Sequence, residues 1–163
     1  MKIISLTDAY LFNFLVLYIA LKEKVKSFLK EKGYIVEDCG AHKFDKNDDY
    51  PDFISKAADA VSKDPENSKG IIFGGSGQGE AMVANKFHGV RAAVFYGHEP
   101  EIISLSREHN NANILSIGAR FVKEEKLLPL IKKWLDAPFL GDERHKRRIE
   151  KIRDIEDSFG CGC

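Results

Sequence analysis

The chain has 163 residues, of which 44% are hydrophobic, and this size and composition allow one compact domain with an ordinary packed core. Lysine plus arginine and aspartate plus glutamate each number 25, so the chain is formally neutral. A neutral chain lacks the overall positive field that favours nucleic acid or an anionic membrane, and we expect neither as a partner.

Cysteine usage and the longest apolar run indicate the compartment. Cys39, Cys161 and Cys163 make no recognisable disulfide framework or metal-ligand spacing, which favours a reducing environment. The most apolar stretch, residues 10–21, is about 12 residues long, against the roughly 20 needed to cross a bilayer. Because no small-residue cleavage site follows it, a secretory signal peptide is the weaker interpretation. We expect a cytoplasmic protein without a membrane segment.

Short apolar runs alternate with amphipathic segments along the chain. Most of the runs are continuously apolar, as in parallel strands that are covered by helices on both faces. The expected strands are residues 2–6, 34–37, 70–73, 90–96 and 113–117. The expected helices are residues 21–32, 51–62, 78–86, 100–109 and 123–137. This order predicts a single-domain, Rossmann-like, doubly wound α/β fold with a five-stranded parallel sheet.

A charged segment at residues 142–157 follows the last of these helices. Ile149, Ile152 and Ile155 recur in it every three residues, which predicts an outlying helix with a narrow apolar seam. Such a helix has little of its own domain to cover. We therefore expect it to pack on a partner subunit, which predicts a homodimer.

The third expected strand runs into a glycine-rich turn. Residues 74–80 read Gly-Gly-Ser-Gly-Gln-Gly-Glu, and the scarcity of side chains lets backbone N–H groups approach an anion at the start of the next helix. The run is neither a Walker loop nor a dinucleotide fingerprint of the first βα unit. It predicts a phosphate or oxyanion cradle, with a mere tight turn as the alternative interpretation.

Glu80 is expected in the first turn of that helix. One interpretation is a carboxylate that compensates the helix dipole. The other is a catalytic base that moves a proton between adjacent carbons of a sugar, while the neighbouring amides hold the enediolate oxygen.

Two further polar groups follow the fourth and fifth strands. His109 and Asn110 end the helix after strand four, where a histidine could move the protons that open a furanose ring. The alternative is a histidine that only compensates the helix dipole. Arg120 follows strand five and places a guanidinium at a strand end.

The tail carries the only concentrated basic run, residues 144–148. Arg144 and Arg148 are four residues apart, so on a helix they share a face and could grip a phosphate. A solvated charged face and a nucleic-acid contact are the alternatives. Nearby acidic residues, at positions 142, 143, 150 and 154, disfavour the nucleic-acid contact.

Taken together, these segments resemble the ribose-5-phosphate isomerase B family, which includes the galactose-6-phosphate isomerase subunits. The resemblance covers about residues 21–157, in order and at plausible spacing. The matching segments are residues 38–41, 48–53, 70–86, 89–93, 106–113, 118–120 and 144–148.

The resemblance implies a homodimer that interconverts ribose 5-phosphate and ribulose 5-phosphate through an enediolate, without a metal or organic cofactor. Many members carry a cysteine base where this chain has Gly74, whereas the branch with Gly-Gly-Ser-Gly-x-Gly-Glu uses the glutamate, here Glu80. The implied catalytic residues are Glu80 as base, His109 for ring opening and Ser76 at the reacting oxygens. The implied substrate-binding residues are Asp8, Tyr50, Gly75, Gly77, Gly79, Asn110, Arg120, Arg144 and Arg148.

The chain departs from the family pattern after its first strand. Where the family has Ser/Thr-Asp-His-Ala-Gly, Asp8 is kept, but Ala9 stands at the histidine position and the glycine is missing. The next recognisable helical segment arrives about seven residues late, close to two helical turns. Residues 9–20 thus form a replaced or inserted apolar helical segment. It lies inside one sugar-phosphate isomerase domain, residues 1–159, which a Gly/Cys tail at 160–163 follows.

Two functions are compatible with this departure. The first is a pentose-phosphate isomerase with weakened activity, because Asp8 would cap the lengthened helix and no longer position the sugar. The alternative is a catalytically impaired isomerase scaffold, natural or engineered, that presents the apolar helix at 9–20 to a protein or antibody partner.

Overall fold

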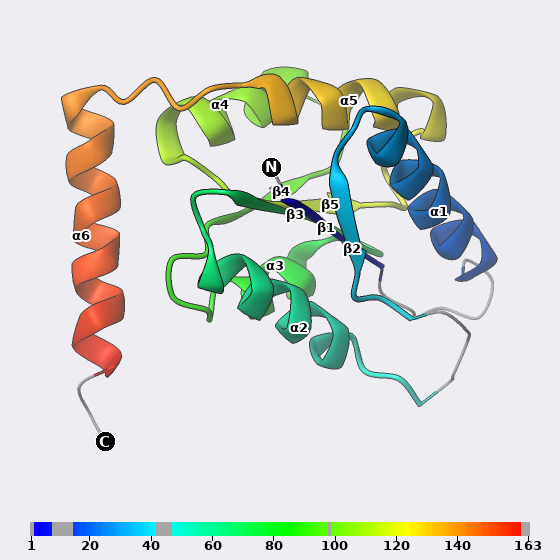
Figure 1. The fold of residues 1–163 in the computed structure, drawn as a ribbon, viewed down its shortest axis with the longest axis horizontal. Coiled ribbons are helices and arrows are strands. Elements are labelled where there is room, and N and C mark those ends of the chain that lie inside the picture. The colour runs from blue at the N-terminus through cyan, green and yellow to red at the C-terminus, as the bar shows by residue number, and fades with distance from the viewer. Residues whose placement is uncertain (1, 8–14, 42–46, 98, 161–163) are drawn as a thin grey trace.

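The structure is a computed structural model that describes the backbone of residues 2–7, 15–41, 47–97 and 99–160 (Figure 1). Side chains are described from Ala20 to Ser158 within these ranges.

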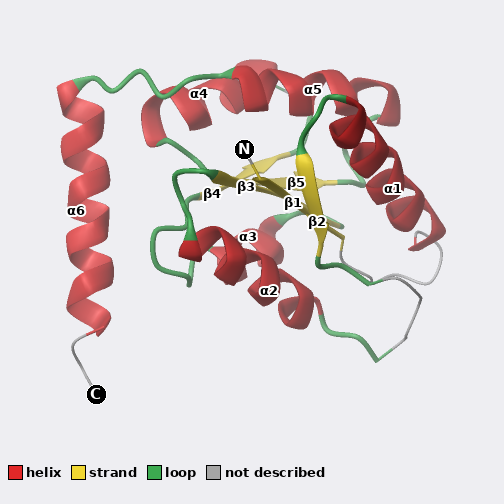
Figure 2. Ribbon diagram, viewed as in Figure 1, coloured by secondary structure: helices red, strands yellow, loops and turns green. Residues whose placement is uncertain are grey.

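Five parallel strands form one sheet in the order β2-β1-β3-β5-β4 (Figure 2). The strands are β1 (Lys2–Thr7), β2 (Ile35–Asp38), β3 (Ser68–Gly74), β4 (Ala92–Phe95) and β5 (Ile114–Gly118). The strand order reverses at β1, because β2 pairs with one side of it and β3 with the other. The predicted parallel α/β fold is confirmed, and the carboxyl ends of β1, β3 and β5 meet at one edge of the sheet.

Helices cover both faces of the sheet (Figure 1). One face carries α1 (Leu15–Glu31), α4 (Pro100–Asn110) and α5 (Glu124–Asp136), and the other carries α2 (Tyr50–Lys63) and α3 (Gln78–Ala84). Side chains of β3 alternate between these layers: Ile71 and Phe73 join the core under α1, α4 and α5, whereas Ile72 joins the core under α2 and α3. Both cores are apolar, which explains why the central strands are continuously hydrophobic.

Helix α1 begins at Leu15, six residues before the helix start predicted at residue 21. The predicted extra helical turns therefore include residues 15–20, and positions 9–14 lie outside the described residues. Leu21 and Val25 of this helix are buried in the core. Of the helices in the described ranges, none combines the length and apolarity that a membrane-spanning segment needs.

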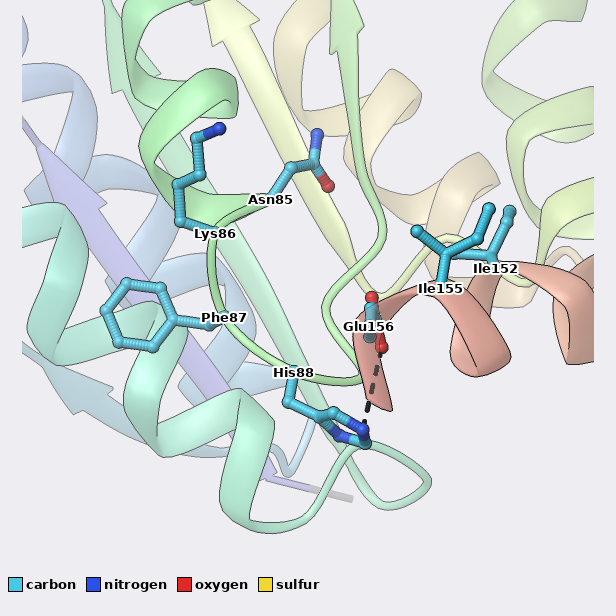
Figure 3. A pocket seen from close by; sticks show the side chains of 7 residues that line it. All are labelled: Asn85, Lys86, Phe87, His88, Ile152, Ile155 and Glu156. Atoms are coloured by element: carbon cyan, nitrogen blue, oxygen red, sulfur yellow. Dashed lines mark ion pairs between the residues drawn. The ribbon is translucent and has the colours of Figure 1, made fainter. Parts of the chain in front are cut away.

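Helix α6 (Glu143–Gly160) stands beside the rest of the domain, as the sequence predicts for this segment (Figure 1). Its last turns are held at the α3–β4 turn, where Glu156 accepts a hydrogen bond of 2.9 Å from the Gly89 N–H and Asp157 lies 2.8 Å from His88 Nε2. A cavity of about 570 Å³ lies between α6 and this turn (Figure 3). Ile152 and Ile155 remain 45% and 56% exposed, so the described part of the chain leaves this end of the apolar seam of α6 partly uncovered.

Candidate active site

The glycine-rich turn lies at the carboxyl edge of the sheet and is fastened to β5. The Ala119 N–H donates to the Gly74 carbonyl at 2.9 Å, and the Ser116 hydroxyl donates to the Gly77 carbonyl at 2.6 Å. Gly77 has a φ of 76°, a left-handed conformation that favours glycine. The turn is thus a rigid connection from β3 into α3.

Glu80 lies in the first turn of α3, as predicted, and its carboxyl group folds back over the end of β3. Its side chain is buried, although it is ionisable. A Cβ atom at Gly74 would collide with this carboxyl group. A side chain at position 74 and the Glu80 carboxylate therefore cannot both occupy the space at the end of β3.

Burial raises the pKa of Glu80 above its ordinary value of 4.5, against the lowering effects of its backbone hydrogen bond and of the positive charge of Arg120. A carboxylate with a raised pKa is a stronger proton acceptor than an exposed one. The position is therefore suited to general-base chemistry.

Other predicted side chains surround the same turn. A Cβ atom at Gly75 would lie 3.0 Å from the Arg120 guanidinium, and one at Gly79 would lie 2.6 Å from the Tyr50 hydroxyl. The missing side chains of these glycines thus make room for an arginine and a tyrosine. The Ser76 hydroxyl accepts a 3.3 Å hydrogen bond from the Gln78 N–H at the start of α3. The turn thus brings a buried carboxylate, a guanidinium and two hydroxyl groups together.

His109 and Asn110 do not join this cluster in one copy of the chain. They end α4, which runs from the carboxyl end of β4 back to the amino end of β5. Asn110 lines a pocket with residues 90–93, at the amino end of β4. At about 3.3 Å per residue, β5 alone separates the two edges of the sheet by roughly 13 Å. Within one chain, the predicted site residues thus fall into two groups at opposite edges.

The His109 group includes a residue that sequence reasoning missed. The His145 ring, from the first turns of α6, stacks on the His109 ring with centroids 4.4 Å apart and planes 10° apart. His145 is only 3% exposed, although the sequence places it in a basic run. A usable signal was its spacing of four residues from Ile149, which puts His145 on the apolar side of the helix.

The remaining predicted residues have simpler positions. Arg144 and Arg148 are exposed on α6, beside the two histidines, and Arg120 is exposed at the other edge of the sheet. Asp8 lies outside the described residues. Among the described residues, no group of three or more His, Cys, Asp and Glu side chains could hold a metal ion.

Comparison with known proteins identifies the relatives of this chain. The family model described as Ribose/Galactose Isomerase matches residues 18–152. The chain belongs to this isomerase family. The match begins after Asp8 and after most of the 9–20 segment, where the sequence departs from the pattern.

Individual relatives agree over most of their length. A probable ribose-5-phosphate isomerase B from Mycoplasma genitalium is 41% identical over 134 residues, which cover 82% of this chain and 86% of the relative. Ribose-5-phosphate isomerase B from Mycobacterium tuberculosis is 38% identical over 136 residues, covering 83% and 82%. The crystal structure of the Mycoplasma genitalium enzyme with bound ribulose-5-phosphate matches with a TM-score of 0.85 at 38% identity, covering 96% of each chain.

Proposed function

We propose that this chain catalyses the aldose–ketose isomerisation of ribose 5-phosphate to ribulose 5-phosphate through an enediolate. The observation that carries the proposal is the buried Glu80 carboxylate above Gly74, whose pKa is raised by burial. Arg120 and the Tyr50 hydroxyl lie against Gly75 and Gly79 of the same turn. Relatives at about 40% identity are named as ribose-5-phosphate isomerases B, which supports the same substrate for this chain.

The proposed chemistry needs one base and no bound metal or cofactor. Glu80 takes the proton from C2 of the open aldose, and the electron pair left on C2 forms the C1–C2 double bond while the C1 oxygen becomes an oxyanion. A proton then passes from the C2 hydroxyl to the C1 oxyanion. Glu80 delivers the proton that it took from C2 to C1, which forms the new C1–H bond, and the C2 oxygen becomes the ketone. Ser76 and the N–H groups of Gly75, Gly77 and Gly79 are the proposed donors to the oxyanion.

The two groups of candidate residues lead us to propose that the working unit is a homodimer. In one chain, His109, Asn110, Arg144 and Arg148 lie at the opposite edge of the sheet from Glu80. A second copy that brings its histidine edge to the glutamate edge would complete the site. The uncovered apolar seam of α6, with Ile152 and Ile155, supports such an interface.

The test of the proposed activity is turnover of ribose 5-phosphate by the purified chain and by its Glu80→Gln variant. We expect the unaltered chain to turn the substrate over and to exchange the C2 proton with solvent. Loss of the base should lower both rates by about 100-fold or more, because the amide cannot accept the proton. Equal rates for the two proteins would contradict the role of Glu80.

The altered segment after β1 favours a second proposal, that activity is weakened and that residues 9–20 serve as a binding helix. Its support is the loss of the His-Ala-Gly sequence after Asp8 and the apolar character of residues 9–20. Replacing residues 9–20 by a short loop that contains His-Ala-Gly distinguishes the active isomerase from the impaired scaffold. Turnover only after this replacement would favour the scaffold, whereas turnover by the unaltered chain would make the altered segment a tolerated variation.

A further inference from the structure

Two histidines at the junction of α4 and α6 form one stacked unit. His109 ends α4, and its ring lies parallel to that of His145, with centroids 4.4 Å apart. His145 is almost wholly buried, so it cannot turn away into solvent, whereas His109 is partly exposed. One face of the His109 ring is therefore fixed against a buried surface, and the rest of the ring stays accessible.

The side-chain contact of His145 fits a neutral ring. Its Nε2 lies 3.2 Å from the Nε of Arg144. An arginine N–H can only donate, so His145 Nε2 is the acceptor in this contact, a role that a neutral imidazole can take. Burial, followed by the charges of His109, Arg144 and Arg148, lowers the pKa of His145, while Asp142 opposes this shift. A neutral ring allows a parallel stack with His109 without repulsion between two cations.

Backbone hydrogen bonds of the loop between α5 and α6 support the stacked histidines. The His145 N–H donates to the Asp142 carbonyl at 2.8 Å, and the Leu140 N–H donates to the Glu108 carbonyl at 3.2 Å. The first bond closes the first turn of α6, and the second fastens the loop before α6 to the end of α4. Arg144, which is adjacent to His145, is one of the arginines proposed to bind the phosphate.

We propose that His145 is a positioning residue for ring opening: it fixes the plane of the His109 imidazole and ties it to the helix that carries Arg144 and Arg148. The inference rests on the proposed isomerase function and adds a residue to it. When the furanose opens, the bond between C1 and the ring oxygen breaks, the proton of the C1 hydroxyl leaves, and the ring oxygen gains a proton. These transfers require an imidazole that is held in one orientation relative to the arginines that bind the phosphate.

The test uses the fact that ribulose 5-phosphate cannot form a furanose, because its C5 oxygen carries the phosphate. Exchange of its C1 hydrogen with deuterium from D2O therefore needs the base but no ring opening, whereas turnover of ribose 5-phosphate needs both. Both rates are measured at saturating substrate for the full chain, His145→Ala and His145→Phe. The control is Lys146→Ala, an exposed neighbour on α6 paired with Glu143.

We expect His145→Ala to turn over ribose 5-phosphate about 10-fold or more slowly while exchanging ribulose 5-phosphate within about 2-fold of the unaltered chain. His145→Phe restores a flat ring and should recover turnover to within about 3-fold. Lys146→Ala should change neither rate. Unchanged turnover by His145→Ala, or an equal fall in both rates, would overturn the inference. If the unaltered chain shows neither exchange nor turnover, the proposed isomerase function fails and this inference fails with it.

Discussion

At the scale of single residues, Gly74 and Glu80 depend on one another. The Glu80 carboxyl group fills the space that a side chain at position 74 would occupy. The structure therefore gives a physical reason for the resemblance-based expectation that a cysteine at this position and a glutamate base are alternatives. A residue with a Cβ at position 74 would displace the carboxylate from the end of β3.

Gly74→Ala tests this dependence. The Glu80 carboxylate is the far end of a flexible side chain and can move, so we expect the variant to fold with little loss of thermal stability. Turnover of ribose 5-phosphate should fall by about 100-fold, because the base is misplaced. In a Glu80→Gln background the same substitution should have no further effect on turnover. Normal turnover by the single variant would show that the carboxylate need not lie above position 74.

At the scale of elements, a buried ion pair joins α1 to the last residue of β2, and a hydrogen bond joins α1 to the loop that follows. Lys22 is fully buried, and its Nζ lies 3.1 Å from Asp38 Oδ1 and 2.8 Å from the Ala41 carbonyl. Lys26 donates to the other Asp38 oxygen at 3.0 Å, and the Gly40 N–H donates to the first at 3.1 Å. Burial raises the pKa of Asp38, but hydrogen bonds from Lys26 and Lys22 outweigh burial, so its pKa lies below 3.8. This network positions the loop after β2 at the carboxyl edge of the sheet.

Lys22→Met should lower the free energy of unfolding by about 3 kcal/mol, because it leaves a buried carboxylate with one cation fewer. Lys63→Met, which breaks the exposed pair with Asp59, is the control and should cost about 0.5 kcal/mol or less. The Lys22→Met effect should be constant above pH 3.8, the ordinary pKa of an aspartate, and should shrink as the pH falls below it. The reason is that, below this pH, the unfolded chain binds more protons than the folded chain, in which the pKa of Asp38 is lower. Urea unfolding at several pH values measures the difference, and similar losses for the two variants would contradict the assignment.

At the scale of the whole molecule, the residues proposed for the active site lie at the two edges of the sheet. Glu80 lies at the carboxyl edge, and His109, stacked on His145, lies at the amino edge. In a parallel sheet, the helix after a strand begins at the carboxyl edge and ends at the amino edge. Glu80 begins one such helix and His109 ends another, so the two groups lie apart within one chain. A symmetric dimer would bring two copies of each group into two equal sites.

Subunit mixing tests this division. Glu80→Gln and His109→Asn should each be inactive as homodimers on ribose 5-phosphate. After the two are unfolded together and refolded, half of the dimers should be mixed, and each mixed dimer should have one intact site. Turnover should therefore return to about a quarter of the unaltered level. If both residues act within one chain, mixing should restore nothing.

The sequence by itself determined the order of strands and helices along the chain, the parallel sheet, and the position of Glu80 directly after a glycine-rich turn. These features are local, because apolar runs, prolines and glycines act on their immediate neighbours in the chain. The membership of His109, Asn110 and Arg120 in a candidate site also followed from short segments that resemble the family.

Only the tertiary structure decided how these residues meet. It placed the Glu80 carboxyl over Gly74, put His109 and Asn110 at the opposite edge, and buried His145, which the sequence presents as part of a charged run, against His109. Such contacts join residues far apart in the chain, and they depend on how helices are placed on the sheet. A side chain's burial and its stacking partner are therefore properties of the packed molecule, which local sequence patterns do not contain.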